Sequence, residues 1–124
     1  MKTLTLLASI TWALASPALA GPGPHDHAPL HGGVVVEVKD MDYELVARPT
    51  VIQLYLRDHG KAADLSRATA KLTLLTGSER QEVELQPAGN RFEATGSFKV
   101  GPGTKAVAVV RLAGKASTAR FTVK

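Results

Sequence analysis

The sequence predicts an all-β fold: a small antiparallel β-sandwich of immunoglobulin-like size, with a small closed β-barrel as the alternative. Two observations lead to this prediction. Apolar and polar residues alternate with a period of two along most of the chain after Gly33, which is typical of strands with one buried face. Turn signals rich in Gly, Pro, Asn and Asp separate these stretches about every ten residues, and no amphipathic helical pattern stands out between them.

The expected strands follow one another directly along the chain. In the clearest of them, VIQLYLRD, the alternation places Ile52, Leu54 and Leu56 in the core and leaves Tyr55 and Arg57 pointing outward. The segments DMD, TGSE, PAGN, GPGT and AGK are expected turns, and HGKAADLSR is a longer connection. The expected strands span residues 34–39, 43–48, 51–58, 70–74, 82–86, 92–94 continuing to 98–100, 106–112 and 119–123.

Residues 1–20, MKTLTLLASITWALASPALA, have the features of a secretory signal peptide. Lys2 precedes an apolar stretch, and Ala18-Leu19-Ala20 supplies the small-x-small pattern of a cleavage site. The apolar stretch is shorter than the roughly 20 residues that a membrane-spanning helix needs, and no later stretch is long enough. We therefore expect cleavage before Gly21, a periplasmic location, and no transmembrane segment after cleavage.

The composition narrows the class of protein further. The chain contains no cysteine, so an exported form has neither a disulfide framework nor thiolate metal ligands. Removal of residues 1–20 leaves a basic excess of about three residues, which is spread along the chain and does not indicate nucleic-acid binding. We expect a flexible leader rich in His, Pro and Gly over 21–33 and a single β-sandwich domain over 34–124.

Three of the four histidines lie in this leader, GPGPHDHAPLHGG. His25 and His27 point to the same side of an extended segment, and His31 follows after a short loop, so the three imidazoles can reach one ion. Imidazole is a ligand of Zn, Cu and Ni, and three imidazoles with a water form a known type of metal site. The alternative interpretation is a solvated leader without a metal role.

Further candidates lie at and beyond the start of the domain. Gly32 and Gly33 predict a hinge before the first strand, which would keep the His31 imidazole at the rim of the domain. His59, in the turn RDHGK, could complete a metal site if the leader folded back, although plain exposure is the alternative. Met41 offers a thioether that suits Cu(I) or Ag(I), although packing is the alternative.

The residues from His31 onward resemble a small periplasmic domain found in, or beside, the periplasmic adaptor subunits of heavy-metal efflux (RND, resistance–nodulation–division) exporters. The segments that carry the resemblance are HGGVVVEV, YELVARPTVIQLYLRDHGKAADL, ATAKLTLL and ELQPAGNRFEATGSF, and it covers about 31 to 123. The resemblance implies an all-β fold, a periplasmic location and a link to metal tolerance. By position it implies a metal role for His31 first and for His25 and His27 after it. The chain lacks the helical hairpin and lipoyl-like half-motifs of a full adaptor, which favours an accessory domain.

We therefore expect a periplasmic, non-catalytic accessory protein that binds Cu, Ag, Zn or Ni and is linked to heavy-metal efflux or tolerance, including that of Co and Cd. Its expected partner is an efflux-pump adaptor or another periplasmic protein. The alternative is an immunoglobulin-like interaction module without a metal role, which would bind a partner through an edge strand such as 34–38. An enzyme is not expected, because the sequence shows no nucleophile elbow, no acid pair in a recognisable motif and no phosphate-binding glycine loop.

Overall fold

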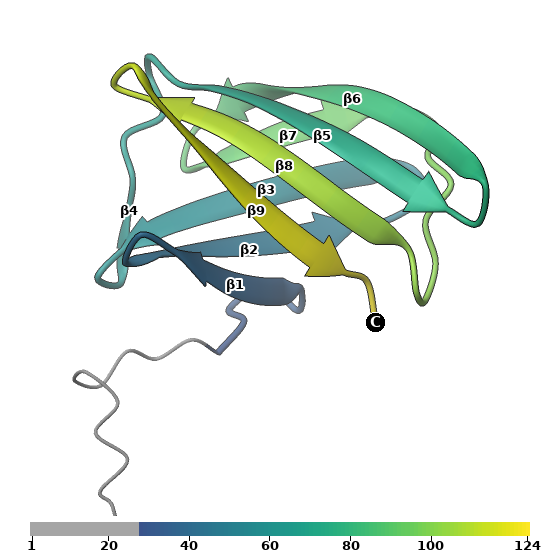
Figure 1. Ribbon diagram of the computed structural model, residues 1–124. Helices are drawn as coiled ribbons and strands as arrows, with labels where there is room; N and C mark the ends of the chain where they lie inside the picture. The colour runs from purple at the N-terminus through teal and green to yellow at the C-terminus, as the bar shows by residue number, and fades with distance from the viewer. Residues whose placement is uncertain (1–27) are drawn as a thin grey trace, which may run out of the picture.

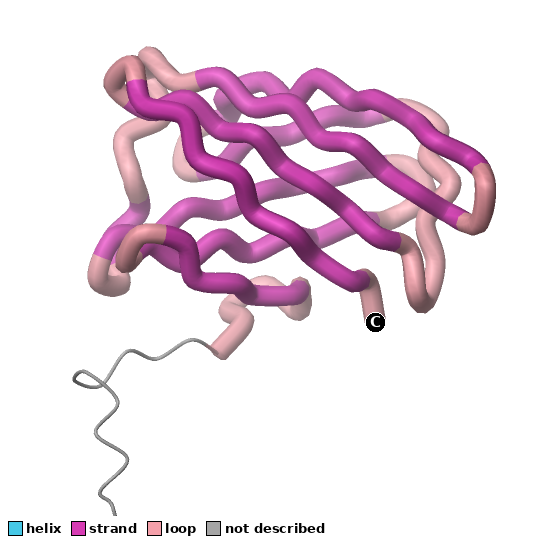
Figure 2. Tube along the Cα trace, in the orientation of Figure 1, coloured by secondary structure: helices cyan, strands magenta, loops and turns pink. Residues whose placement is uncertain are grey.

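Nine antiparallel strands form the described part of the chain, residues 28–124 of a computed structural model (Figure 1). Strands and loops make up this part entirely (Figure 2). No helix with the length and apolar character that a membrane crossing requires occurs between residues 28 and 124. The strands are β1 (Val34–Val38), β2 (Met41–Ala47), β3 (Val51–Asp58), β4 (Lys61–Ala62), β5 (Thr69–Thr76), β6 (Glu79–Ala88), β7 (Arg91–Thr95), β8 (Lys105–Leu112) and β9 (Lys115–Thr122).

The strands form one continuous sheet that curls back on itself. Its order is β1-β2-β3-β7-β6-β5-β8-β9, with the short β4 paired to β3. Strand β6 joins the two halves, because residues 79–85 pair with β5 whereas residues 86–88 pair with β7. The two edge strands, β1 and β9, come to lie beside each other, so the sheet is nearly a closed barrel (Figure 1). The predicted all-β antiparallel fold is confirmed.

The core lies between the two halves of the curled sheet, where the period-two alternation predicted it. Ile52, Leu54 and Leu56 of β3 are fully buried, as are Leu72 of β5 and Phe92 of β7. Each such side chain stabilises the fold by about 1.5–3 kcal/mol relative to an exposed position. Because the core contains no disulfide, this apolar packing and the strand ladders hold the sheet together.

The turns show where the sequence prediction differs in detail. The chain reverses at Lys39 and Asp40, both with positive φ, so Met41 already belongs to β2 and not to a DMD turn. His59 and Gly60 form a second turn of the same kind, and the segment expected to be only a connection contributes the short strand β4. Two consecutive positive φ values define type I′ turns, whose twist matches that of paired antiparallel strands.

Candidate functional site

A buried carboxylate on the outer face of the sheet holds the end of the leader. The Glu44 side chain on β2 is fully buried, although it points away from the apolar core. Its carboxylate accepts hydrogen bonds from the backbone N–H of Leu30 at 3.1 Å, of His31 at 2.8 Å and of Gly33 at 3.0 Å. Residues 28–33, which we call the strap, are therefore fastened to the sheet at this point.

The two glycines of the strap serve different purposes. Gly32 has φ +76°, in the left-handed region that side chains with a Cβ rarely adopt, and this bends the strap toward β1. Gly33 lies directly against β2, because a Cβ there would stand 2.3 Å from the carbonyl oxygen of Leu45. The residues expected to form a hinge thus form an ordered turn that delivers the Gly33 N–H to Glu44.

The imidazole of His31 is fixed by two independent contacts. Its Nδ1 lies 2.9 Å from Oε1 of Glu44, and the ring stacks on Tyr55 with the centroids 3.6 Å apart. Tyr55 lies on β3 directly opposite Glu44 in the strand register, so neighbouring strands supply both contacts. About a third of the His31 side chain, 34%, is exposed. Its Nε2 makes no hydrogen bond within residues 28–124.

Arg57 completes a charged network beneath the strap. Its Nη1 lies 3.4 Å from Oε1 of Glu44, and its Nη2 lies 4.0 Å from Oδ2 of Asp42. The same guanidinium donates to the backbone carbonyl of Ala28 at 3.3 Å, which ties the first described residue of the strap to β3. Two carboxylates therefore face one guanidinium, and with a neutral imidazole the network carries one net negative charge.

The protonation of Glu44 determines which nitrogen of His31 is available. Burial raises the pKa of Glu44, but the hydrogen bonds from the His31 ring and from the Gly33, His31 and Leu30 amides outweigh burial and leave the pKa below its ordinary value. The carboxylate is thus ionised near neutral pH and can only accept hydrogen bonds. Nδ1 of His31 must then be the donating nitrogen, which leaves Nε2 as the nitrogen that can offer a lone pair.

The other sequence candidates lie elsewhere on the molecule. His59 occupies the exposed β3–β4 turn, where its Nδ1 lies 2.6 Å from Oδ1 of Asp58. Met41 opens β2 opposite Asp58 and packs against the core. Met41 and Asp58 also line a shallow groove of about 720 Å³ that does not include His31. His25 and His27 lie outside the described residues.

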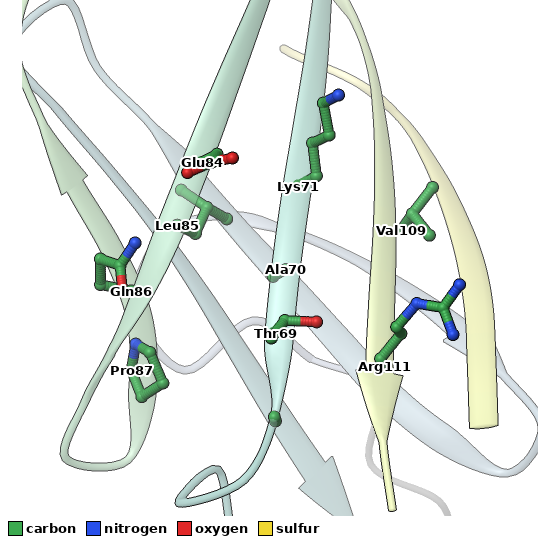
Figure 3. A pocket seen from close by; sticks show the side chains of 10 residues that line it. Thr69, Ala70, Lys71, Glu84, Leu85, Gln86, Pro87, Val109 and Arg111 are labelled. Atoms are coloured by element: carbon green, nitrogen blue, oxygen red, sulfur yellow. The ribbon is translucent and has the colours of Figure 1, made fainter. Parts of the chain in front are cut away.

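A second groove crosses the outer face of β6, β5 and β8 on the other half of the sheet (Figure 3). It has a volume of about 400 Å³, and its walls carry Lys71 and Glu84 on neighbouring strands together with Val109 and Arg111 of β8. Of the two described histidines, neither His31 nor His59 lines this groove or the groove at Met41.

His31 is therefore a single oriented imidazole and not a member of a complete metal site within the described chain. Between residues 28 and 124, no three His, Cys, Asp or Glu side chains are grouped so that they could hold a metal ion. The arrangement can supply one imidazole nitrogen to a cation, backed by a carboxylate. Further ligands would have to come from outside residues 28–124, where His25 and His27 are the nearest imidazoles in sequence.

The sequence prediction named His31 but missed the residues that position it. Tyr55 and Arg57 were expected to point outward, and they do. Glu44 lies on the same outer face, and the strap covers all three side chains, so they are buried. The available signal was the combination of a carboxylate, an aromatic ring and a guanidinium on adjacent outward positions next to a glycine-rich segment. On an ordinary solvated face these residue types are equally common, so the signal is visible only once the strand register is known.

Comparisons with known proteins give no family for this chain. No protein-family model, no curated protein and no solved structure matches it. The function must therefore be inferred from the chemistry of the His31 imidazole, from the Glu44 network that holds it, and from the sequence features that precede residue 28.

Proposed function

We propose that this chain is an exported, periplasmic, non-catalytic protein that binds a transition-metal ion through His31 and acts as an accessory to heavy-metal efflux or tolerance. The export signal expected in residues 1–20 and the histidine-rich leader support the location and the role. The resemblance to domains associated with metal-efflux adaptors points to the same class of function. The ions that fit an imidazole ligand are Zn(II), Cu(II) and Ni(II).

The observation that carries the proposal is the pairing of the His31 ring with Glu44. Metal-binding histidines almost always donate their other ring N–H to a carboxylate, a carbonyl or a water, which fixes the ring and raises the basicity of the ligating nitrogen. In this chain Nδ1 is engaged by the buried carboxylate while the ring is partly exposed. Nε2 makes no hydrogen bond within residues 28–124, so its lone pair can be offered to a cation.

The leader offers the remaining ligands. His27 precedes His31 by four residues and His25 by six, so both are near enough along the chain to be candidate ligands of the same ion. Three imidazoles and a water then give a four-coordinate site of a known type. Cu(I) and Ag(I) prefer a thioether ligand, and Met41 is the only methionine after residue 20. Binding of these two ions would therefore point to Met41 and not to the imidazole ligands.

The proposal is tested by calorimetric titration of the purified protein with ZnCl₂, CuCl₂, NiCl₂ and AgNO₃. We expect at least one ion to bind more tightly than about 10 μM, which corresponds to about 7 kcal/mol. His31→Ala should lose most of this affinity and the double variant His25→Ala/His27→Ala part of it, whereas His59→Ala serves as the matched control. Equal binding by the wild type and the His31→Ala variant, or no binding above that threshold, would contradict the proposal.

The link to efflux needs a separate test, because metal binding alone does not identify a partner. We expect the metal-loaded protein to retain a periplasmic efflux-pump adaptor on an affinity column and the His31→Ala variant to retain less of it. A partner whose retention is the same after substitution of all four histidines would instead favour the interaction module considered from the sequence. In that case β1 or another surface of the sheet would be the binding element.

A further inference from the structure

One carboxylate, that of Glu44, both fastens the strap and engages the candidate ligand. Its oxygens accept three strap N–H groups, and Oε1 also pairs with Nδ1 of His31. His31 itself belongs to the strap, so its ring can keep the contact with Glu44 only while the strap is docked. We propose that cation binding at His31 and docking of the strap are one coupled event, with Glu44 as its positioning residue; this inference rests on the proposed function.

The charge of the network favours a cation at this position. Asp42 and Glu44 bring two negative charges to the outer face of β2, and Arg57 on β3 returns one positive charge. Glu37 on β1, opposite Asp42 in the register, adds a further carboxylate at the edge of the same face. A cation on Nε2 of His31 offsets this negative excess, and partly buried charges are screened less by salt than exposed ones.

The coupling follows from the two ends of one imidazole. A cation on Nε2 withdraws electron density from the ring and makes the Nδ1–H a stronger donor to Glu44, and charge-assisted hydrogen bonds are the stronger class. A tighter contact between His31 and Glu44 then holds the strap more firmly on β2 and β3. By linkage the reverse also holds. A change that loosens the docked strap lowers the affinity for the cation by the same factor, which is typically about 5–150-fold for coupled sites.

The same arrangement selects the class of cation. Only an ion that accepts imidazole nitrogen can use Nε2, which favours Zn(II), Cu(II) or Ni(II) over Ca(II) and Mg(II), whose ligands are oxygens. The Asp42 and Glu44 carboxylates already face the Arg57 guanidinium, so their oxygens serve the network and not the ion. We therefore expect Zn(II) to stabilise the docked strap and Mg(II) to leave it unchanged.

The inference is tested by amide hydrogen exchange followed by NMR, with ZnCl₂ as the probe. Zn(II) at about 100 times its dissociation constant should slow exchange of the Leu30, His31 and Gly33 amides at least about fivefold, and at most about 100-fold. The amide of Gly114, in the distant β8–β9 turn, is the internal control and should not change. MgCl₂ at the same concentration should leave all four amides unchanged.

Glu44→Gln supplies the second arm, and Glu82→Gln, on the exposed face of β6, is the matched control. Glu44→Gln should weaken Zn(II) binding about 10–100-fold, as substitution of outer-shell partners does. Absence of His31-dependent binding in the wild type would overturn the proposed function and this inference together. His31-dependent binding with unchanged strap exchange, or with Glu44→Gln binding like the wild type, would overturn the coupling alone. The wild-type exchange experiment decides the matter if Glu44→Gln does not fold.

Discussion

The imidazole of His31 lies flat on the phenol ring of Tyr55, with ring centroids 3.6 Å apart and ring planes 4° from parallel. The stack fixes the tilt of the imidazole, and the hydrogen bond to Glu44 fixes its rotation about the ring normal. Together the two contacts leave the imidazole only one orientation on the sheet. The imidazole expected at the rim of the domain is therefore held in a defined position on the sheet.

Replacement of Tyr55 by a residue without an aromatic ring should let the His31 imidazole adopt other orientations. Tyr55→Ala removes the stacking surface and should destabilise the protein by about 3 kcal/mol, because a large buried ring is lost. Tyr55→Phe keeps the ring and loses only the long 3.4 Å hydrogen bond from the Tyr55 hydroxyl to Gln53, so it should cost less than about 1 kcal/mol. Urea unfolding gives both values, and the NMR shift of the His31 ring proton reports the stack. Equal shifts in the two variants would contradict the argument.

Ionised Glu44 should make the free energy of unfolding of the metal-free protein decrease at acidic pH. Burial raises the pKa of Glu44, but the hydrogen bonds from the His31 ring and the strap amides lower it by more than burial raises it. The folded-state pKa therefore lies below the ordinary value of 4.5. This stabilisation is fully present above pH 4.5 and is lost as the pH falls through the lower folded-state pKa. Urea unfolding between pH 7 and pH 3, in EDTA, should show a steeper loss for the wild type than for Glu44→Gln.

The matched control for this acid dependence is Glu82. Its pKa is also lowered, by its hydrogen bond and charge interaction with Lys71, but the pair is exposed to solvent. Exposed ion pairs contribute little to stability. Glu82→Gln should therefore follow the wild-type pH profile closely, and a flattening equal to that of Glu44→Gln would show that the strap network is not the source of the acid dependence.

The two strap glycines should respond differently to alanine. Gly33→Ala places a Cβ 2.3 Å from the carbonyl oxygen of Leu45, so the strap must move away from β2, at about 1–3 kcal/mol. Gly32→Ala meets no atom within 4 Å, and its φ of +76° costs only about 1 kcal/mol. Urea unfolding gives the order of the two variants. Gly33→Ala alone should also shift the His31 ring proton, and a larger destabilisation by Gly32→Ala would contradict this account.

The alternation of side-chain directions along β3 shows how much of the fold could be predicted from the sequence. It predicted correctly that Leu54 and Leu56 face the core and that Tyr55 and Arg57 face outward, because a period of two leaves no other choice. It could not predict that Tyr55 and Arg57 are buried. Their burial depends on contacts with the strap. The local alternation of apolar and polar residues cannot predict contacts between residues so far apart in the chain.

The same limit applies to the candidate site. The sequence singled out His31 because a histidine next to paired glycines has a local signature, and a ring at the rim of the domain was expected from it. Glu44, thirteen residues further along, has no such signature, since an outward carboxylate in a strand usually contacts solvent. Its role became visible only when the β1–β2 hairpin placed Glu44 beneath the strap.

The β8–β9 turn offers a prediction that is independent of any metal. Ala113 and Gly114 both have positive φ, at 51° and 79°, which makes this a type I′ turn. Alanine is strained in that conformation, whereas Asn-Gly is the preferred pair. Ala113→Asn should therefore stabilise the protein by about 1 kcal/mol, and urea unfolding would measure it. Ala116→Asn, an exposed position in β9, is the control and should not stabilise, because asparagine is disfavoured in strands. An Ala113→Asn variant no more stable than the wild type would contradict the turn assignment.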